Sequence, residues 1–167
     1  MATTYEAIAT VSVGSGGAAN IEFTSIPATY TDLKVVCSLR GTYAGDGDDV
    51  NVYFNGTNTN RSGKLLYGTG SAAASVNVNN HTNIYPGSTA TASTFNNGEF
   101  YIPNYASSNF KSISGDSVTE NNATLAYTDL TASLWSSTAA ITSMTIYPNS
   151  GSWVQYSTAT LYGIKKS

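Results

Sequence analysis

The chain has few charged residues and few of the residue types on which metal sites and disulfide scaffolds depend. Asp, Glu, Lys and Arg make up 10% of its 167 residues, against about 25% in ordinary soluble domains. It contains one cysteine and one histidine. A single cysteine excludes an intramolecular disulfide, and structural zinc usually needs several Cys and His ligands. Stability must therefore come from packing or oligomerisation, and the polar surface from Asn, Thr, Ser and Gly.

The charge balance and the apolar runs exclude further classes. The formal net charge is −3, and the seven Lys and Arg residues are scattered, whereas binding to nucleic acid depends on clustered basic side chains. No apolar run approaches the roughly 18 residues of a membrane-spanning helix. Residues 1–8 have neither the basic nor the apolar region of a signal peptide. We expect a soluble protein made in a cytoplasm, without a nucleic-acid or membrane partner.

The pattern along the chain is that of an all-β protein. Short runs of β-branched and aromatic residues alternate with clusters of Gly, Asn, Ser and Asp, which is typical of strands and turns. We expect one antiparallel β-sandwich domain over residues 1–167, jelly-roll-like, with about 9–11 strands. A polar excursion at about 56–93, rich in Gly, Ser, Asn and Thr, is expected at its edge. Strands are predicted at 5–13, 20–23, 32–40, 49–55, 64–67, 76–85, 94–102, 111–120, 127–135, 141–147 and 153–164.

Some conspicuous residues are better explained by packing than by chemistry. Cys37 is in phase with neighbouring apolar residues of its predicted strand, and a buried Cys behaves as a small hydrophobe. Trp135 and Trp153 lie on strand patterns and are expected in the core. Gly115 interrupts its strand and is a candidate for a β-bulge.

The candidate binding residues lie in or beside predicted loops. Asp46, Asp48 and Asp49 place three carboxylates within four residues. They form a possible calcium site, because hard cations take oxygen ligands. The alternative is a solvated acidic turn. We expect no other cofactor. Exposed tyrosines are common anchors of protein interfaces and stack on sugars. The predicted partner-binding residues are Tyr5, Tyr43, Tyr67, Tyr85 and His81, with His81 on a surface loop.

No catalytic motif emerges. The single histidine has no local spacing to a nucleophile and a carboxylate. Carboxylate pairs for glycoside hydrolysis could be drawn from Glu22, Glu99, Asp116, Glu120 and Asp129, but no motif selects one pair. We therefore expect a protein that is not an enzyme.

Five phrases, taken together, resemble a group of small virion proteins of tailed bacteriophages, especially those of aquatic bacteria. The phrases are IEFTSIPATYTDL (21–33), YIPNY (101–105), DSVTENN (116–122), LTASLW (130–135) and YSTATLYGI (156–164). The resemblance covers nearly the whole chain and is loosest at 56–93. It implies a β-sandwich that is a structural component of the virion, and it supplies no catalytic residues.

Within that class, two functions are open. The first is a capsid decoration (cement) protein, bound to the major capsid protein as a small oligomer, expected to be a trimer. The alternative is a receptor- or carbohydrate-binding tip of a tail or head fibre, with 56–93 as the recognising segment. The absence of a heptad stalk favours decoration, and residues 2–5 together with 56–93 are expected to form one contact edge.

Overall fold

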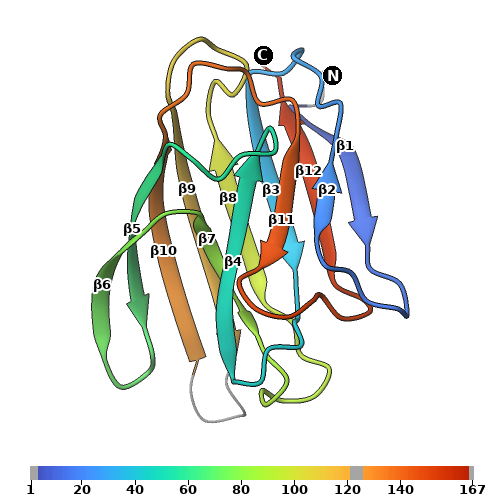
Figure 1. Ribbon diagram of the computed structural model, residues 1–167, viewed down its shortest axis with the longest axis vertical. Helices are drawn as coiled ribbons and strands as arrows, with labels where there is room; N and C mark the ends of the chain where they lie inside the picture. The colour runs from blue at the N-terminus through green and yellow to red at the C-terminus, as the bar shows by residue number, and fades with distance from the viewer. Residues whose placement is uncertain (1–3, 121–125, 166–167) are drawn as a thin grey trace.

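A computed structural model of the protein describes residues 4–120 and 126–165. Its regular structure consists of strands, arranged as two antiparallel sheets that face each other (Figure 1). This confirms the predicted all-β, jelly-roll-like sandwich. Twelve strands are present in the described residues, one more than the upper end of the predicted range.

The larger sheet has eight strands in the order β1-β12-β3-β8-β9-β10-β5-β6, and the smaller has four in the order β2-β11-β4-β7. The strands of the larger sheet are β1 (Tyr5–Ser12), β3 (Asp32–Ser38), β5 (Arg61–Gly68), β6 (Ala73–Val78), β8 (Asn97–Ile102), β9 (Lys111–Glu120), β10 (Ala126–Trp135) and β12 (Thr158–Ile164). Those of the smaller sheet are β2 (Ile21–Phe23), β4 (Gly47–Phe54), β7 (His81–Pro86) and β11 (Met144–Pro148).

The core lies between the two sheets and follows from the period of two along each strand. Along β9, buried and exposed residues alternate from Lys111 to Thr119. The predicted core residues Cys37, Trp135 and Trp153 are all buried, which confirms them. The Trp153 ring meets Tyr85 edge-on at 4.9 Å between centroids, and its indole Nε1 donates to the Ile146 carbonyl at 3.2 Å. One face of each sheet is thereby covered and the other is left outside.

The polar segment 56–93 carries three strands of the sandwich, where two were predicted, and two of them, β6 and β7, are edge strands. Strand β5 pairs with β10, β6 pairs with β5, and β7 crosses to the smaller sheet to pair with β4. Buried polar side chains in this segment form hydrogen bonds with backbone groups of neighbouring strands. The Asn83 amide in β7 donates to the carbonyls of Glu99 and Asp116 at 3.1 and 2.7 Å.

Gly115 is not at a bulge. It pairs in regular register with Phe100 on one side and Thr131 on the other. Its lack of a side chain has another reason. A Cβ atom there would lie 2.5 Å from the Thr82 carbonyl oxygen of the opposing sheet, so glycine permits the two sheets to approach.

The expectation of a shared contact edge is wrong. Strand β1, which follows residues 2–4, lies at one edge of the eight-stranded sheet, and β6 lies at the opposite edge (Figure 1). Residues 2 and 3 are outside the described residues. A single partner surface therefore cannot combine both segments along one edge.

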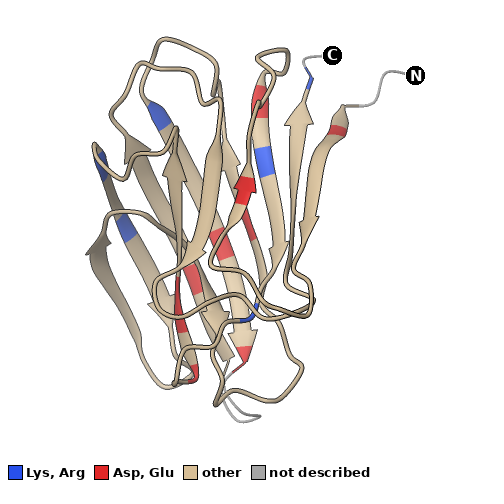
Figure 2. Ribbon diagram, turned by 45° about the vertical axis from the view of Figure 1, so that its right-hand side comes forward, with Lys and Arg blue, Asp and Glu red and all other residues tan. Residues whose placement is uncertain are grey.

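Charged side chains are few and spread over both sheets (Figure 2). Lys165, from the terminal basic pair, is exposed and bonds to Glu6 at 2.5 Å. The described residues include no helix of the length and hydrophobicity that a membrane span requires.

Candidate functional site

The predicted partner-binding residues divide into two groups. Tyr5 and Tyr43 are exposed to 50% and 38%, and Tyr67 is half-buried. The surface expectation is wrong for Tyr85 and His81, which are 0% and 2% exposed. The Tyr85 ring packs in the core, and its hydroxyl donates to the Ser150 carbonyl at 2.7 Å. Burial, followed by the Asp48 carboxylate, raises the pKa of Tyr85 above its ordinary value.

His81 lies between two carboxylates instead of on a loop. Its Nε2 is 2.8 Å from Asp129 Oδ2, and its Nδ1 is 3.2 Å from Asp49 Oδ1. The Asp49 contact is an ion pair with poor hydrogen-bond alignment. Ser117 donates its hydroxyl proton to Asp129 Oδ1 and accepts the Ile84 backbone N–H at 2.9 Å. The cluster joins β4 and β7 of one sheet to β9 and β10 of the other.

The electrostatics of the cluster favour a charged imidazole. Burial by itself lowers the pKa of His81, but the Asp129 hydrogen bond and the two nearby carboxylate charges outweigh it and raise the pKa to about 9. An opposite charge within about 4–6 Å stabilises the protonated form. At neutral pH the cluster thus holds an imidazolium between the sheets.

The order of groups does not match a catalytic triad. In a triad the histidine lies between the hydroxyl and the carboxylate. Here Asp129 lies between Ser117 and His81, and both ring nitrogens face carboxylates. The geometry fits a clamp between the sheets, in which the Asp129 carboxylate accepts from Ser117 and pairs with His81.

The three loop aspartates have separate partners. Asp46 accepts from the Tyr127 hydroxyl at 2.8 Å, Asp48 accepts from Asn149 Nδ2 at 3.2 Å, and Asp49 faces His81. No group of three or more His, Cys, Asp or Glu side chains within the described residues is arranged to hold a metal ion. Calcium binding stays a prediction, which thermal melts with and without a chelator test.

Among the other acids, the structure brings Glu99 opposite Asp116 across β8 and β9. Glu99 also pairs with Lys34 at 2.8 Å. Burial, and then the charges of Glu99 and Asp129, raise the pKa of Asp116. Glu120 instead accepts hydrogen bonds from Thr91 and Thr94.

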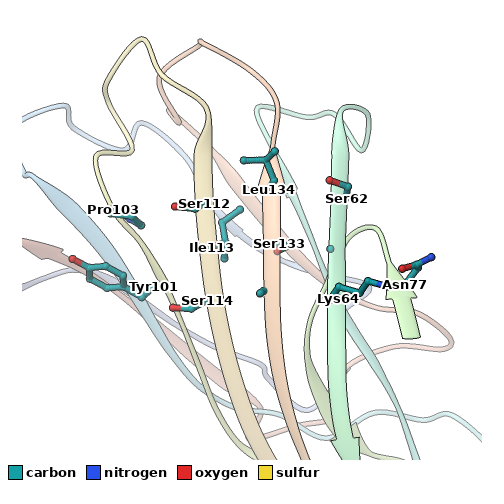
Figure 3. Close-up of a pocket in the computed structure, with 12 residues that line it drawn as sticks. Ser62, Lys64, Asn77, Tyr101, Pro103, Ser112, Ile113, Ser114, Ser133 and Leu134 are labelled. Atoms are coloured by element: carbon teal, nitrogen blue, oxygen red, sulfur yellow. The ribbon is translucent and has the colours of Figure 1, made fainter. Parts of the chain in front are cut away.

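The outer face of the eight-stranded sheet carries apolar and charged side chains, and the charged ones include Lys34, Lys64, Glu99 and Asp116. Leu66 and Leu130 are cross-strand neighbours in β5 and β10 and are exposed to 60% and 57%. Val118 in β9 is also exposed, to 43%. Beside these residues lies an open groove of about 690 Å³ (Figure 3). Its lining includes Tyr101 and the hydroxyls of Ser112 and Ser114, so the surface offers both apolar and hydrogen-bonding groups.

A second groove, of about 470 Å³, lies on the outer side of the four-stranded sheet. Tyr53 and Tyr147, from the adjacent strands β4 and β11, place their ring centroids 4.2 Å apart. Asparagine side chains surround them. Sequence reasoning missed both tyrosines. The signal for this face is the period of two along β4, where polar or aromatic residues alternate with buried apolar ones. The outward residues are Asp49, Asn51 and Tyr53, and the buried ones are Val50, Val52 and Phe54.

Comparison with known proteins assigns no family. No family model and no curated protein matches the chain. Among solved structures, it is similar to the galectin LEC-6 of Caenorhabditis elegans, with 10% identity, a TM-score of 0.35, and coverage of 91% of this chain and 94% of the galectin. It is also similar to the CBM40 of the Ruminococcus gnavus IT-sialidase, with 9% identity, a TM-score of 0.24, and coverage of 85% and 91%.

Proposed function

We propose that the chain is a non-enzymatic structural protein of a tailed-phage virion, and that it decorates the capsid. It binds the major capsid protein as a small closed oligomer, a trimer. The observation that supports this is the uncovered face of the eight-stranded sheet, where Leu66 and Leu130 form an exposed aliphatic pair. Exposed apolar patches on folded proteins mark interaction surfaces.

A surface of this kind suits attachment to a repeating lattice. Asp116 lies directly opposite Leu130, and the hydroxyl groups of Ser114 and Ser112 follow farther along β9 on the same face and offer hydrogen bonds. Binding several capsid subunits at once raises the effective affinity without any single strong contact. Few charges on the chain mean that attachment depends mainly on apolar and hydrogen-bonding contacts.

The test combines copy number with point variants. The copy number of the chain per purified virion is compared with that of the major capsid protein, and decoration predicts comparable numbers. Leu66→Lys and Leu130→Lys, made singly, are then added to capsids that lack the protein. Each is expected to reduce occupancy about tenfold or more, equivalent to about 1.4 kcal/mol of binding free energy.

Tyr156→Lys is the matched control, because Tyr156 is exposed to 71% and lies in a loop outside the large sheet. It should bind as the unsubstituted protein does. Equal occupancy of all three variants, or only a handful of copies per virion, would contradict the decoration role.

A receptor- or carbohydrate-binding fibre tip is the second candidate. The observation that favours it is the groove of tyrosine and asparagine side chains on the four-stranded sheet. A low copy number in virions would support this candidate over decoration.

A further inference from the structure

We propose that the groove on the outer side of the four-stranded sheet binds a neutral hexopyranose, with Tyr53 and Tyr147 as its stacking platform. The groove lies between these two rings and the turn that joins β6 to β7. This inference rests on the second candidate function and is independent of the decoration role.

The aromatic part of the site is built from neighbouring strands. The rings of Tyr53 and Tyr147 are half-buried and inclined at 51° to each other. Burial, and then a hydrogen bond with Tyr53, raise the pKa of Tyr147 above its ordinary value, so its hydroxyl stays neutral. Two fixed rings offer an apolar surface with polar tips, which matches the C–H face and hydroxyl rim of a pyranose.

The polar part of the site consists mainly of amides, which both donate and accept hydrogen bonds. Asn51 Nδ2 is 3.4 Å from Asn149 Oδ1, and Asn149 Nδ2 donates to Asp48 Oδ1 at 3.2 Å. These contacts orient the two amides at the groove. Fixed amide groups are suited to recognising adjacent sugar hydroxyls, each of which is also a donor and an acceptor.

Asn80, in the turn that joins β6 to β7, adds a further amide to the site. Its side chain is half-buried and lines the groove together with the two tyrosine rings. An amide at this position brings another donor and acceptor to the rim of the groove.

The charges at the groove favour a neutral ligand. Asp49 is the carboxylate that lines it, and none of the described residues in its lining is Lys or Arg. His81 also borders the groove, but both of its ring nitrogens face aspartates. An anionic sugar would lie beside the Asp49 carboxylate, while the His81 imidazolium is already shared between Asp49 and Asp129. The volume of about 470 Å³ falls within the usual range of small-ligand pockets, about 300–1,000 Å³.

The test uses the isolated protein and defined probes. The methyl pyranosides of glucose, galactose and mannose are titrated to about 50 mM while amide shifts are followed by NMR, with glucuronic acid as the anionic comparison. We expect at least one neutral glycoside to bind, with shifts at the groove, and glucuronic acid to bind about tenfold more weakly or not at all. No binding by any neutral glycoside would overturn the proposal.

Variants then locate the site. Tyr147→Ala and Asn149→Ala are each expected to weaken binding about tenfold, and Tyr156→Ala, at an exposed tyrosine away from the groove, should not change it. Asn149 is exposed, so its variant remains informative if Tyr147→Ala unfolds. Unchanged affinity in Asn149→Ala and in folded Tyr147→Ala would overturn the site. Virion copy number does not enter this experiment, so failure here and failure of the decoration role are separately observable.

Discussion

At the scale of single residues, the clearest consequence of folding is the environment of His81. An isolated histidine in a polar stretch becomes a buried imidazolium because Asp129, 48 residues later in the chain, reaches its Nε2. A buried charge is tolerated when it is paired and hydrogen-bonded. The stability of the fold should therefore depend on the protonation of this one ring.

The pH dependence follows from the direction of the shift. The pKa of His81 is about 9 in the folded protein, above the ordinary histidine value of 6.5. Its stabilising contribution is then fully present below about pH 6.5 and is lost as the pH rises through about 9. The free energy of unfolding, measured in urea, is expected to be lower at pH 9.5 than at pH 6.

The His81→Gln variant is the control for other groups that titrate in this range. It should be about 3 kcal/mol less stable at pH 6, because it leaves the buried Asp129 without its charge partner. It should also lose much less stability between pH 6 and pH 9.5. An equal loss in both proteins would show that His81 is not the group responsible.

At the scale of strands, the close contact between the two sheets requires glycine at position 115 in β9. The Gly115 position faces the Thr82 carbonyl of β7, and the backbone there has little freedom because β7 also packs against β8 and β10. A larger residue at position 115 would push β9 away from β7 at this contact.

Gly115→Ala is therefore expected to destabilise the protein by about 1–3 kcal/mol, the usual cost of overpacking a core. Urea unfolding measures this directly. Gly14→Ala is the matched control, because a Cβ atom there meets no heavy atom within 4 Å, and its effect should stay within about 0.5 kcal/mol. Similar effects at both positions would contradict the close contact between β7 and β9.

At the scale of the whole molecule, the two sheets leave two chemically different outer faces. The larger carries exposed leucines beside a groove, and the smaller carries tyrosines and asparagines. The chain as a whole has few charges, and on the larger face Lys34 and Glu99 pair with each other. Contacts made through such faces should respond little to ionic strength, because salt screens interactions between charges.

If the protein decorates capsids, its affinity for them should change by less than about threefold between 50 and 500 mM NaCl. Capsid binding measured by sedimentation across that range provides the check. A fall of tenfold or more over that range would indicate attachment through ion pairs and would count against the leucine face as the principal contact.

Several features were predictable from local sequence. The all-β class, most strand positions and the burial of Cys37, Trp135 and Trp153 follow from a period of two, which each strand carries in its own residues. The split of 76–85 into β6 and β7 was not predicted, since the two belong to different sheets. Polar residues of β7 are buried because partners elsewhere in the chain satisfy them.

What the sequence by itself determined is therefore the class of fold, the low charge and the absence of a catalytic motif. Only the tertiary structure decided which polar residues are inside and which faces stay open. The burial of Tyr85, the pairing of His81 with Asp129, and the meeting of Tyr53 with Tyr147 all join segments far apart in the chain. Local patterns carry no information about such pairings, because the partner strand supplies the buried contacts and the hydrogen bonds.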